Sequence, residues 1–427
     1  MITACSFLSL SDLTECQAVT FFNGTSIGTT IPSEIGLLTQ LTYLDLNWNA
    51  LSGTIPFNLG SLTHIRHLNL GNNQFLGKVP SSLFTLMRLN YLNVGNNQLT
   101  GTIPDVWRDD DNITELYLDA NLLTGTIPST LGNLTNLQTL SLFSNPLSGT
   151  IPFTIGNLVL LTSLILYNNQ LIGTIPSSLG NLNQLTYLSL GLNKLQGSIP
   201  STLGNLVNAN NINLGENQLN GTIPSTFGNL IQLNYLNLGT NQLTGSIPDT
   251  WEGNEFVTDV YMDHNLLSGP IPSTMGSLAQ LRTLNLVANT LSGAIPSTMG
   301  NLIQLTLLDL YDNQLNGAIP SSLGNLVQLT FGSFGLNQIS GSIPSTLGNL
   351  ILINVLGLSD IRLTGTIPLT LGNLTNLKDL WLFSNPELGG SIPSSLCSIA
   401  GIRVRIDCSG NIECSCCLEG FDGPSCV

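Results

Sequence analysis

Few residues in this chain of 427 are of the types that carry out acid–base or nucleophilic chemistry. There are only three histidines, His64, His67 and His264, and no motif places a Ser, Cys or Asp beside one of them as a catalytic partner. A lone histidine on a strand is expected to be a surface residue. The glycine-rich phosphate loop and the catalytic His-Arg-Asp of protein kinases are also missing from the sequence. We therefore predict that the protein is not an enzyme and has neither catalytic residues nor a cofactor.

The cysteines are confined to the two ends of the chain, and none occurs between Cys16 and Cys397. An even number of cysteines grouped in this way predicts disulfide-bonded caps that form in an oxidising compartment. The dense C-terminal thiols could instead bind zinc, but no histidine lies near them, so we expect disulfides and no metal. The predicted disulfide cysteines are Cys5, Cys16, Cys397, Cys408, Cys414, Cys416, Cys417 and Cys426.

The overall composition restricts the class of partner. Charged residues make up 8% of the chain, the formal net charge is −15 and hydrophobic residues make up 42%. This hydrophobic content excludes a disordered tail, and the lack of a basic stripe excludes binding to nucleic acid or to an anionic membrane surface. No run of 18 or more apolar residues occurs, so no transmembrane helix is predicted. The first residues lack a basic n-region, and we expect a leader or anchor to precede residue 1.

The elements that would position these residues repeat every 24 residues. The Ile-Pro dipeptide marks the period, from Ile31-Pro32 to Ile367-Pro368, and a last copy at Ile392-Pro393 arrives one residue late. Counting Val79-Pro80, the chain contains sixteen copies. Between them it reads L-x-x-L-x-L-x-x-N-x-L-x-G-x-I-P-x-x-L-G-N-L. Such a period predicts a solenoid, in which each coil stacks on the next and shares one core with it.

Each part of the repeat has a physical role. In L-x-L the alternation has period 2, so Leu44 and Leu46 face the core while Asp45 faces away from it. The asparagine at the position of Asn49 recurs along the array, and its amide can satisfy backbone groups where the coil turns inward. Two departures, Gly332 for a core leucine and Ile361 for the asparagine, predict that residues 332 to 361 are the least regular part of the coil.

This pattern strongly resembles the plant-type leucine-rich repeat, with its L-x-G-x-I-P segment, found in the ectodomains of receptor-like kinases and receptor-like proteins. The resemblance covers about residues 17 to 408. It implies an α/β solenoid, a right-handed leucine-rich-repeat superhelix with a parallel β-sheet on the concave face and irregular or 3-10 turns on the convex side. We expect an N-terminal cap with a Cys pair over residues 1–24, about 15 to 16 repeats over 25–396 and a Cys-rich cap over 397–427.

The outward strand positions, those of residues 43, 45, 47 and 48 in the first repeat, would line the concave face. Over fifteen repeats none of these 60 positions is Lys or Arg, ten are acidic, and all eight tyrosines of the chain fall on them. Tyrosine offers a large contact area and a polar tip, which suits recognition, although aromatic residues also favour strands for structural reasons. The predicted ligand-binding residues are Tyr43, Trp48, Tyr91, Tyr117, Asp119, Phe143, Tyr167, Tyr187, Tyr235, Asp259, Tyr261, Asp263 and Tyr311. Phe331, Trp381 and Phe383 occupy the same positions.

We therefore predict an extracellular, secreted or cell-surface recognition module that binds a peptide, a protein or a neutral glycan. The resemblance implies a membrane co-receptor as a further possible partner. Five N-glycosylation sequons support secretion weakly, at Asn23, Asn112, Asn133, Asn220 and Asn373. Two alternatives remain open. One is a structural or adhesive wall or matrix protein, and the other is ice binding through a row of threonines before Ile-Pro, which includes Thr126, Thr150 and Thr174.

Overall fold

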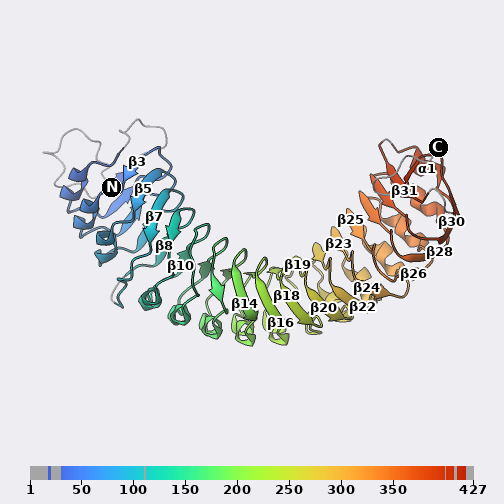
Figure 1. Cartoon of the computed structure of the whole chain (residues 1–427), viewed down its shortest axis with the longest axis horizontal. Coiled ribbons are helices and arrows are strands. Elements are labelled where there is room, and N and C mark those ends of the chain that lie inside the picture. Colours follow the sequence, from blue (N-terminus) through green and yellow to red (C-terminus); the bar gives the residue numbers. More distant parts are fainter. Residues whose placement is uncertain (1–17, 21–29, 110–111, 400, 408–410, 420–427) are drawn as a thin grey trace. The chain divides into compact units, whose positions relative to one another are not determined.

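The computed structural model describes residues 18–20, 30–109, 112–399, 401–407 and 411–419 (Figure 1). The chain divides into two compact units, Met1–Ala209 and Asn210–Val427, and each is described by itself. Several residues with predicted roles lie outside the described residues: Cys5, Cys16, Asn23, Cys408 and Cys426. Within the described ranges, no helix is both long and apolar enough to span a bilayer.

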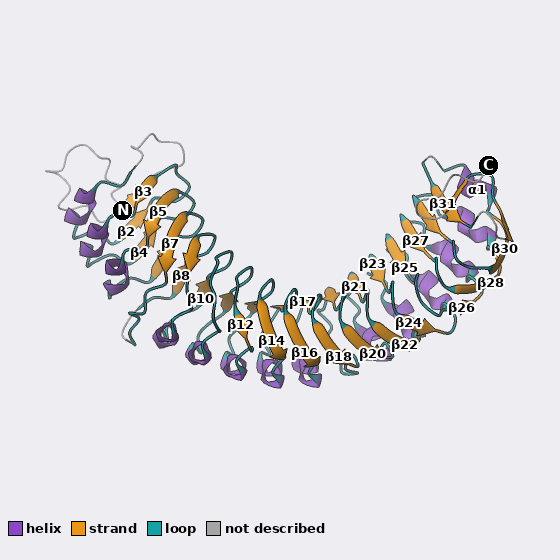
Figure 2. Cartoon of the chain, viewed as in Figure 1, coloured by secondary structure: helices purple, strands orange, loops and turns teal. Residues whose placement is uncertain are grey.

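Most 24-residue repeats form one coil that contains a 3-10 helix, whereas the described residues of the coils with Trp107 and Trp251 include none. In the repeat that begins at β10 (Thr139–Ser141), a short strand is followed by a turn, an extended segment and the 3-10 helix η6 (Phe153–Asn157). The next strand, β11 (Ser163–Ile165), then pairs in parallel with β10. Figure 2 shows this alternation of strands and helical turns within both units. The chain is therefore an α/β solenoid, as the sequence predicts.

In the first unit, the main sheet runs in the order β1, β2, β4, β6, β8, β10, β11, β13. Its further elements are β1 (Ala18–Thr20), η2 (Ser33–Leu37), β2 (Tyr43–Asp45), β3 (Ser52–Thr54), η3 (Phe57–Ser61), β4 (His67–Asn69), β5 (Gln74–Lys78), η4 (Ser81–Thr85), β6 (Tyr91–Asn93), β7 (Gln98–Thr102), β8 (Glu115–Tyr117), β9 (Leu122–Thr124), η5 (Ser129–Asn133), β12 (Ile172–Gly173), η7 (Ser177–Asn181), β13 (Tyr187–Ser189), β14 (Lys194–Ser198) and η8 (Ser201–Asn205).

In the second unit, the main sheet runs in the order β15, β17, β19, β21, β23, β25, β27, β29, β31, β33. The elements are β15 (Asn211–Asn213), β16 (Gln218–Thr222), η9 (Ser225–Asn229), β17 (Tyr235–Asn237), β18 (Gln242–Gly245), β19 (Asp259–Tyr261), β20 (Leu266–Gly269), η10 (Ser273–Ser277), β21 (Thr283–Asn285), β22 (Thr290–Ala294), η11 (Ser297–Asn301), β23 (Leu307–Asp309), β24 (Gln314–Asn316), η12 (Ser321–Asn325), β25 (Phe331–Ser333), β26 (Ser340–Gly341), η13 (Ser345–Asn349), β27 (Val355–Gly357), β28 (Arg362–Thr366), η14 (Leu369–Asn373), β29 (Asp379–Trp381), β30 (Glu387–Ser391), α1 (Ser394–Cys397), β31 (Arg403–Ile406), β32 (Asn411–Glu413) and β33 (Cys417–Glu419).

The register of the main sheet follows the period of the sequence. Tyr43 pairs with His67 and Leu44 with Leu68, so equivalent residues of successive repeats lie side by side. The leucines of the L-x-L segment are fully buried, with Leu44 and Leu68 at 0% exposure, whereas Tyr43 and Asp45 are half-buried on the other side. The predicted division of each strand into a core side and an outward side is confirmed. Side chains at one outward position consequently form rows that run from strand to strand.

The recurrent asparagine satisfies the backbone where each coil turns inward. The Nδ2 group of Asn145 donates to the carbonyl oxygens of Leu118, Leu142 and Phe143 at 3.1, 3.2 and 3.3 Å. Its Oδ1 atom accepts the backbone N–H of Leu123 at 3.0 Å. The same four contacts recur at Asn313 in the second unit, so the ladder joins each coil to its neighbour.

The turn before each ladder asparagine adopts a left-handed backbone, which the sequence does not reveal. In every repeat the residue at the position of Trp48 has a φ between 47° and 56°, although it is never glycine. Trp48, Leu192 and Leu336 are examples, with φ of 52°, 51° and 51°. An L-residue other than Asn or Asp pays a steric penalty in this region, and the regular hydrogen bonds of the coil must offset it.

The repeats with Gly332 and Ile361 keep the register of the main sheet. Strand β25 pairs with β23 and with β27 without a shift. The buried ring of Phe334 occupies the space beside Gly332, since a Cβ atom placed there would lie 3.4 Å from Phe334 Cε2. At Ile361, the hydrocarbon side chain is buried but cannot form the asparagine contacts. The irregularity is thus confined to side chains and to the short strand β26, and whether this segment opens more easily stays a prediction.

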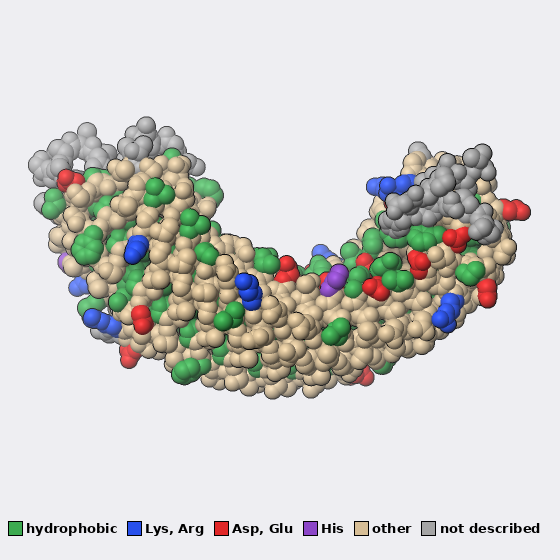
Figure 3. All heavy atoms as spheres, viewed as in Figure 1, with side chains coloured by type: hydrophobic (Ala, Val, Ile, Leu, Met, Phe, Trp, Pro, Cys, Tyr) green, Lys and Arg blue, Asp and Glu red, His purple; other side chains and the backbone are tan. Residues whose placement is uncertain are grey.

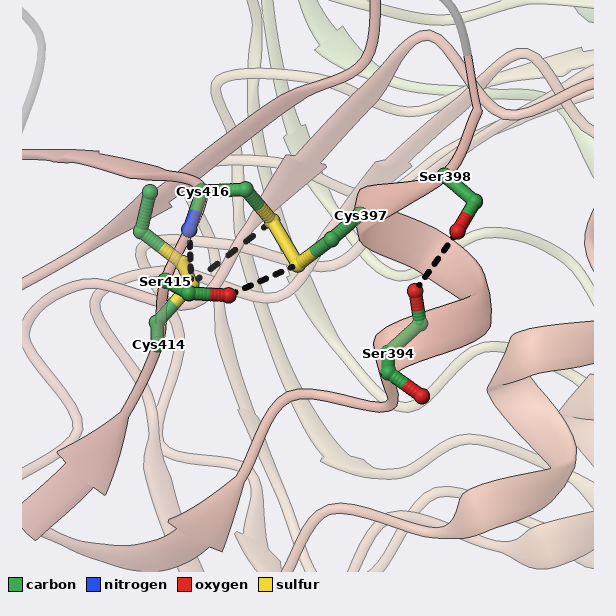
Figure 4. Close-up of a disulfide and its surroundings, with 7 residues drawn as sticks. Ser394, Cys397, Ser398, Cys414, Ser415 and Cys416 are labelled. Carbon is green, nitrogen blue, oxygen red and sulfur yellow. Dashed lines mark hydrogen bonds between the residues drawn. A yellow bond between two sulfur atoms is a disulfide. The ribbon is translucent and has the colours of Figure 1, made fainter.

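Disulfides tie the C-terminal segment together. Cys397 at the end of α1 bonds to Cys416, and Cys414 bonds to Cys417 (Figure 4). Cys414 and Cys417 have C-x₂-C spacing, and the sulfur atoms of Cys397, Cys414 and Cys416 all lie within 4.8 Å of one another. Four of the eight cysteines thus form disulfides here, while their proximity would also suit a metal if the thiols were reduced.

Candidate binding face

The outward positions of the main sheet form what we call the strand face. Every predicted ligand-binding residue lies on it, either on a strand or in the turn that follows. Most of these side chains are half-buried against their neighbours, while Trp48 and Tyr187 are exposed to 60% and 39%. The strands hold Tyr43, Tyr91, Tyr117, Tyr187, Tyr235, Asp259 and Tyr261, and the turns hold Trp48, Asp119, Phe143, Tyr167, Asp263 and Tyr311.

In the first unit, four rings on adjacent strands form a row, and the first three of them are stacked. The ring centroids of Tyr43 and His67 are 4.2 Å apart with an interplanar angle of 7°, and those of His67 and Tyr91 are 4.2 Å apart at 13°. Tyr91 and Tyr117 follow at 5.6 Å and 45°. The expectation that His67 is a plain surface residue is wrong, because its ring is held between two tyrosines. His67 is not among the predicted ligand-binding residues. Its position on β4 could have indicated the stacking, because the register places it between Tyr43 and Tyr91.

Carboxylates accompany this row of rings. The hydroxyl of Tyr117 donates to Glu115 Oε2 at 2.8 Å, and that of Tyr43 donates to Asp45 Oδ2 at 3.3 Å. Burial raises the pKa of Tyr117, and the hydrogen bond and charge of Glu115 raise it further. Burial lowers the pKa of His67, with the charges of Asp45 and Glu115 opposing that effect. The row is therefore a neutral aromatic surface edged by negative charge.

The second unit repeats part of this arrangement. Tyr235 and Tyr261 lie 5.6 Å apart at 45°, the same values as for Tyr91 and Tyr117. In both copies a glycine leaves room for the acidic residue in the turn. A Cβ atom at Gly239 would lie 2.7 Å from Asp263 Oδ1, and one at Gly95 would lie 2.9 Å from Asp119 Oδ2. The sequences of residues 103–125 and 247–269 are related and lie six repeats apart. The chain thus builds one local surface twice, which fits a duplication.

Farther along the second unit the strand face contains a pocket of about 380 Å³. It is lined by Val287, Asp309, Tyr311, Phe331, Ser333, Ser359, Asp360, Trp381 and Phe383. The sequence places all the aromatic members on the strand face but does not show that they enclose a space. Small residues open it, since a Cβ atom at Gly357 would lie 3.1 Å from Trp381 Cε3 and one at Gly335 would lie 3.1 Å from Tyr311 Cδ2.

The absence of basic residues from the strand face requires a correction. The main sheet continues past the fifteenth repeat into β31, where Arg403 and Arg405 pair with Asp379 and Trp381. The Nη2 atom of Arg403 lies 2.6 Å from Asp379 Oδ2. The fifteen repeats whose outward positions lack Lys and Arg end with β29, so they do not include β31. Charged side chains are nevertheless sparse over the surface seen in Figure 3.

The row of threonines before Ile-Pro borders a different surface. Thr126, Thr150 and Thr174 line an open groove of about 1020 Å³ together with the following Ile-Pro segments and Phe153. A groove of this kind differs from the flat threonine array that ice binding would need.

The N-glycosylation sequons in the described ranges differ in exposure. Asn112, Asn220 and Asn373 are exposed, whereas Asn133 is half-buried and its Nδ2 donates to Trp107 O at 3.2 Å.

Comparison with known families identifies the repeat. Two family models, each described as the leucine-rich repeat, match the chain and together cover well over half of it. One matches residues 63–123 and 207–267. The other matches residues 40–62, 136–158, 160–182, 184–206, 280–302 and 304–326. No curated protein sequence matches the chain.

Solved structures of leucine-rich-repeat proteins are similar to it over most of its length. A TDR receptor is 29% identical, with 94% of this chain and 70% of the receptor covered and a TM-score of 0.86. The ectodomain of the Arabidopsis receptor kinase HAESA, in complex with an extended IDA peptide hormone, is 30% identical, with 90% and 72% covered and a TM-score of 0.71. HAESA has also been solved with IDA and the co-receptor SERK1.

The similarity is not limited to plant receptors. A leucine-rich-repeat protein of Leptospira interrogans is 28% identical, with 91% of this chain and 95% of that protein covered and a TM-score of 0.67. The repeat sequence, the paired strands with their asparagine ladder, the family models and the structural neighbours agree. The chain belongs to the leucine-rich-repeat proteins and resembles the plant-type ectodomains among them.

Proposed function

We propose that this chain is an extracellular recognition module that binds a peptide, or an extended segment of a protein, along its strand face. The observation that carries the proposal is that all eight tyrosines occupy strand-face positions. Tyr43 and Tyr91 stack on the two sides of His67, two further pairs of tyrosine rings lie 5.6 Å apart, and carboxylates edge the rings. Rings held in place by stacking offer contact area with little loss of conformational entropy on binding. An acidic edge favours peptides that are neutral or positively charged.

The structural neighbours support a peptide more than a glycan. HAESA is bound to a peptide hormone in one structure, and to a hormone and a co-receptor in another. By analogy, a membrane co-receptor is the partner through which a module without catalytic groups would transmit binding. Disulfides in the C-terminal segment and exposed sequons are consistent with secretion or display at the cell surface.

The proposal is tested by selecting binders from a displayed library of random linear 12-residue peptides. Selected peptides are then measured against the double variant Tyr117→Ala/Tyr261→Ala, which removes one tyrosine from each unit's strand face. The matched control is Phe57→Ala/Phe256→Ala, because these exposed rings (68% and 54%) lie off the strand face. We expect the tyrosine variant to lose at least about tenfold in affinity and the control to bind as the wild type does. Equal binding by all three proteins would point to the structural or adhesive alternative.

A further inference from the structure

The aromatic pocket of the second unit has features that specify a kind of ligand. Its walls are the rings of Tyr311, Phe331, Trp381 and Phe383, contributed by three different repeats. Its volume of about 380 Å³ is at the small end of the range for ligand pockets, so it suits one long side chain rather than a whole hormone. The rings of Tyr311 and Trp381 lie over Gly335 and Gly357, where an added Cβ atom would lie 3.1 Å from each ring and crowd it.

The charge of the pocket is one-sided. Its lining includes the carboxylates of Asp309 and Asp360 and no Lys, Arg or His. Asp309 is held in place because its Oδ1 atom accepts the backbone N–H of Tyr311 at 3.2 Å. Burial raises the pKa of Tyr311, and the negative charges of Asp360, Asp312 and Asp309 raise it further, so all three carboxylates act on this ring.

The basic residues of β31 are outside the pocket lining. Arg403 forms an ion pair with Asp379, and Arg405 pairs with Trp381 in the register of the sheet. Asp309 and Asp360 therefore have no ion-pair partner among the groups that line the pocket with them. A planar cation that enters would meet ring faces and carboxylates together, and both attract it.

We propose that this pocket binds the guanidinium group of an arginine side chain in an extended peptide. Arginine fits better than lysine because its planar group stacks on aromatic rings and can still donate to two carboxylates. The inference rests on the proposed peptide recognition and adds to it a requirement for arginine at one position. The peptide backbone would follow the strand face while one side chain points between the repeats.

The test uses the whole protein and two probes, acetyl-Gly-Arg-Gly-amide and its citrulline counterpart, which has nearly the same shape but no charge. Binding is followed by saturation-transfer NMR and by Trp fluorescence. We expect the arginine probe to bind at least about tenfold more tightly, and this preference to fall severalfold in Asp360→Asn and in Asp309→Asn. The matched control Asp45→Asn, a strand-face aspartate of the first unit, is expected to retain it.

Equal binding of the arginine and citrulline probes would overturn the inference, as would an unchanged preference in both pocket variants. Circular dichroism verifies that each variant is folded, and Trp381→Leu offers a second route because it removes a wall without changing charge. Tighter binding of a further peptide, acetyl-Gly-Lys-Gly-amide, than of the arginine probe would overturn the choice of arginine. The selection of peptides from the library separates failure of the arginine pocket from failure of peptide recognition by the strand face. Peptides that depend on Tyr117 and Tyr261 but lack arginine would leave peptide recognition standing and refute the arginine pocket.

Discussion

Replacing one ladder asparagine should destabilise the solenoid by an amount that its contacts allow us to work out. We consider Asn145→Leu, which keeps the number and branching of the side-chain heavy atoms and removes the polar ones. The carbonyl oxygens that Asn145 contacts each keep another donor: Asn121 for Leu118, Asn169 for Leu142 and the backbone N–H of Ala120 for Phe143. The backbone N–H of Leu123 instead loses Asn145 Oδ1, its acceptor at 3.0 Å.

The free-energy change follows from these contacts. An orphaned buried N–H costs about 1–3 kcal/mol. The Asn145 amide has two N–H donors, shared among the three carbonyl oxygens, and the loss of each costs about 1 kcal/mol. The added hydrocarbon at this buried site returns about 1 kcal/mol. The expected net loss is therefore about 2–4 kcal/mol in the free energy of unfolding of the first unit. An exposed asparagine outside the ladder, Asn157→Leu, should change it by less than about 0.5 kcal/mol.

Amide hydrogen exchange measures the effect at the site. In Asn145→Leu the Leu123 amide should exchange faster by roughly 30- to 1000-fold, the equivalent of that free energy. Urea unfolding gives the same quantity for the whole unit. If Asn145→Leu and Asn157→Leu had the same effect, or if the Leu123 amide kept its protection, the assigned role of the ladder would be refuted.

Three further predictions concern other parts of the structure. Because burial lowers the pKa of His67, its neutral form is favoured in the folded state, so stability should fall as pH decreases from about 6.5 through that lowered pKa. The melting temperature should therefore drop less between pH 7 and pH 5 in His67→Phe than in the wild type or in the control His64→Gln. An equal drop in melting temperature in His67→Phe and the wild type would contradict this. The left-handed φ of 51° at exposed Leu336 predicts that Leu336→Asn stabilises the second unit by about 1 kcal/mol in urea unfolding, and a destabilised variant would count against it. Peptide mapping without reduction should find Cys397 joined to Cys416 and Cys414 joined to Cys417. The protein that has not been reduced should bind no zinc. Stoichiometric zinc together with free thiols would instead assign these cysteines to a metal site.

The sequence predicts the regular part of the fold well because each repeated residue type is required by burial, hydrogen bonding or backbone conformation within its own coil. The position of Leu44 must be apolar to be buried, and that of Asn49 must be both donor and acceptor. The glycine at Gly53 has a φ of 74°, a conformation that other residues adopt only with strain. Such requirements recur in nearly every coil, with Gly332 and Ile361 as departures, so their period is visible without a structure.

The less predictable features depend on side chains from different repeats. The left-handed turn is hidden because its occupants range from Trp48 to Ala120, and only the fixed hydrogen bonds of the coil impose it. The stacking of His67 depends on ring orientation, which a position on the strand does not determine. The arginine pocket needs Gly335 and Gly357 under rings from neighbouring repeats, and the sequence predicts only irregularity in this region.

The central claim is that the strand face is the surface that binds peptide. The most direct measurement is to attach a photo-cross-linker to a peptide from the selection and to identify the residues it labels by mass spectrometry. The account predicts labels on strand-face peptides, such as those containing Tyr117 or Tyr261, and their loss when unlabelled peptide competes. Competed labels on the 3-10 helices or in the groove beside Thr150 would contradict it.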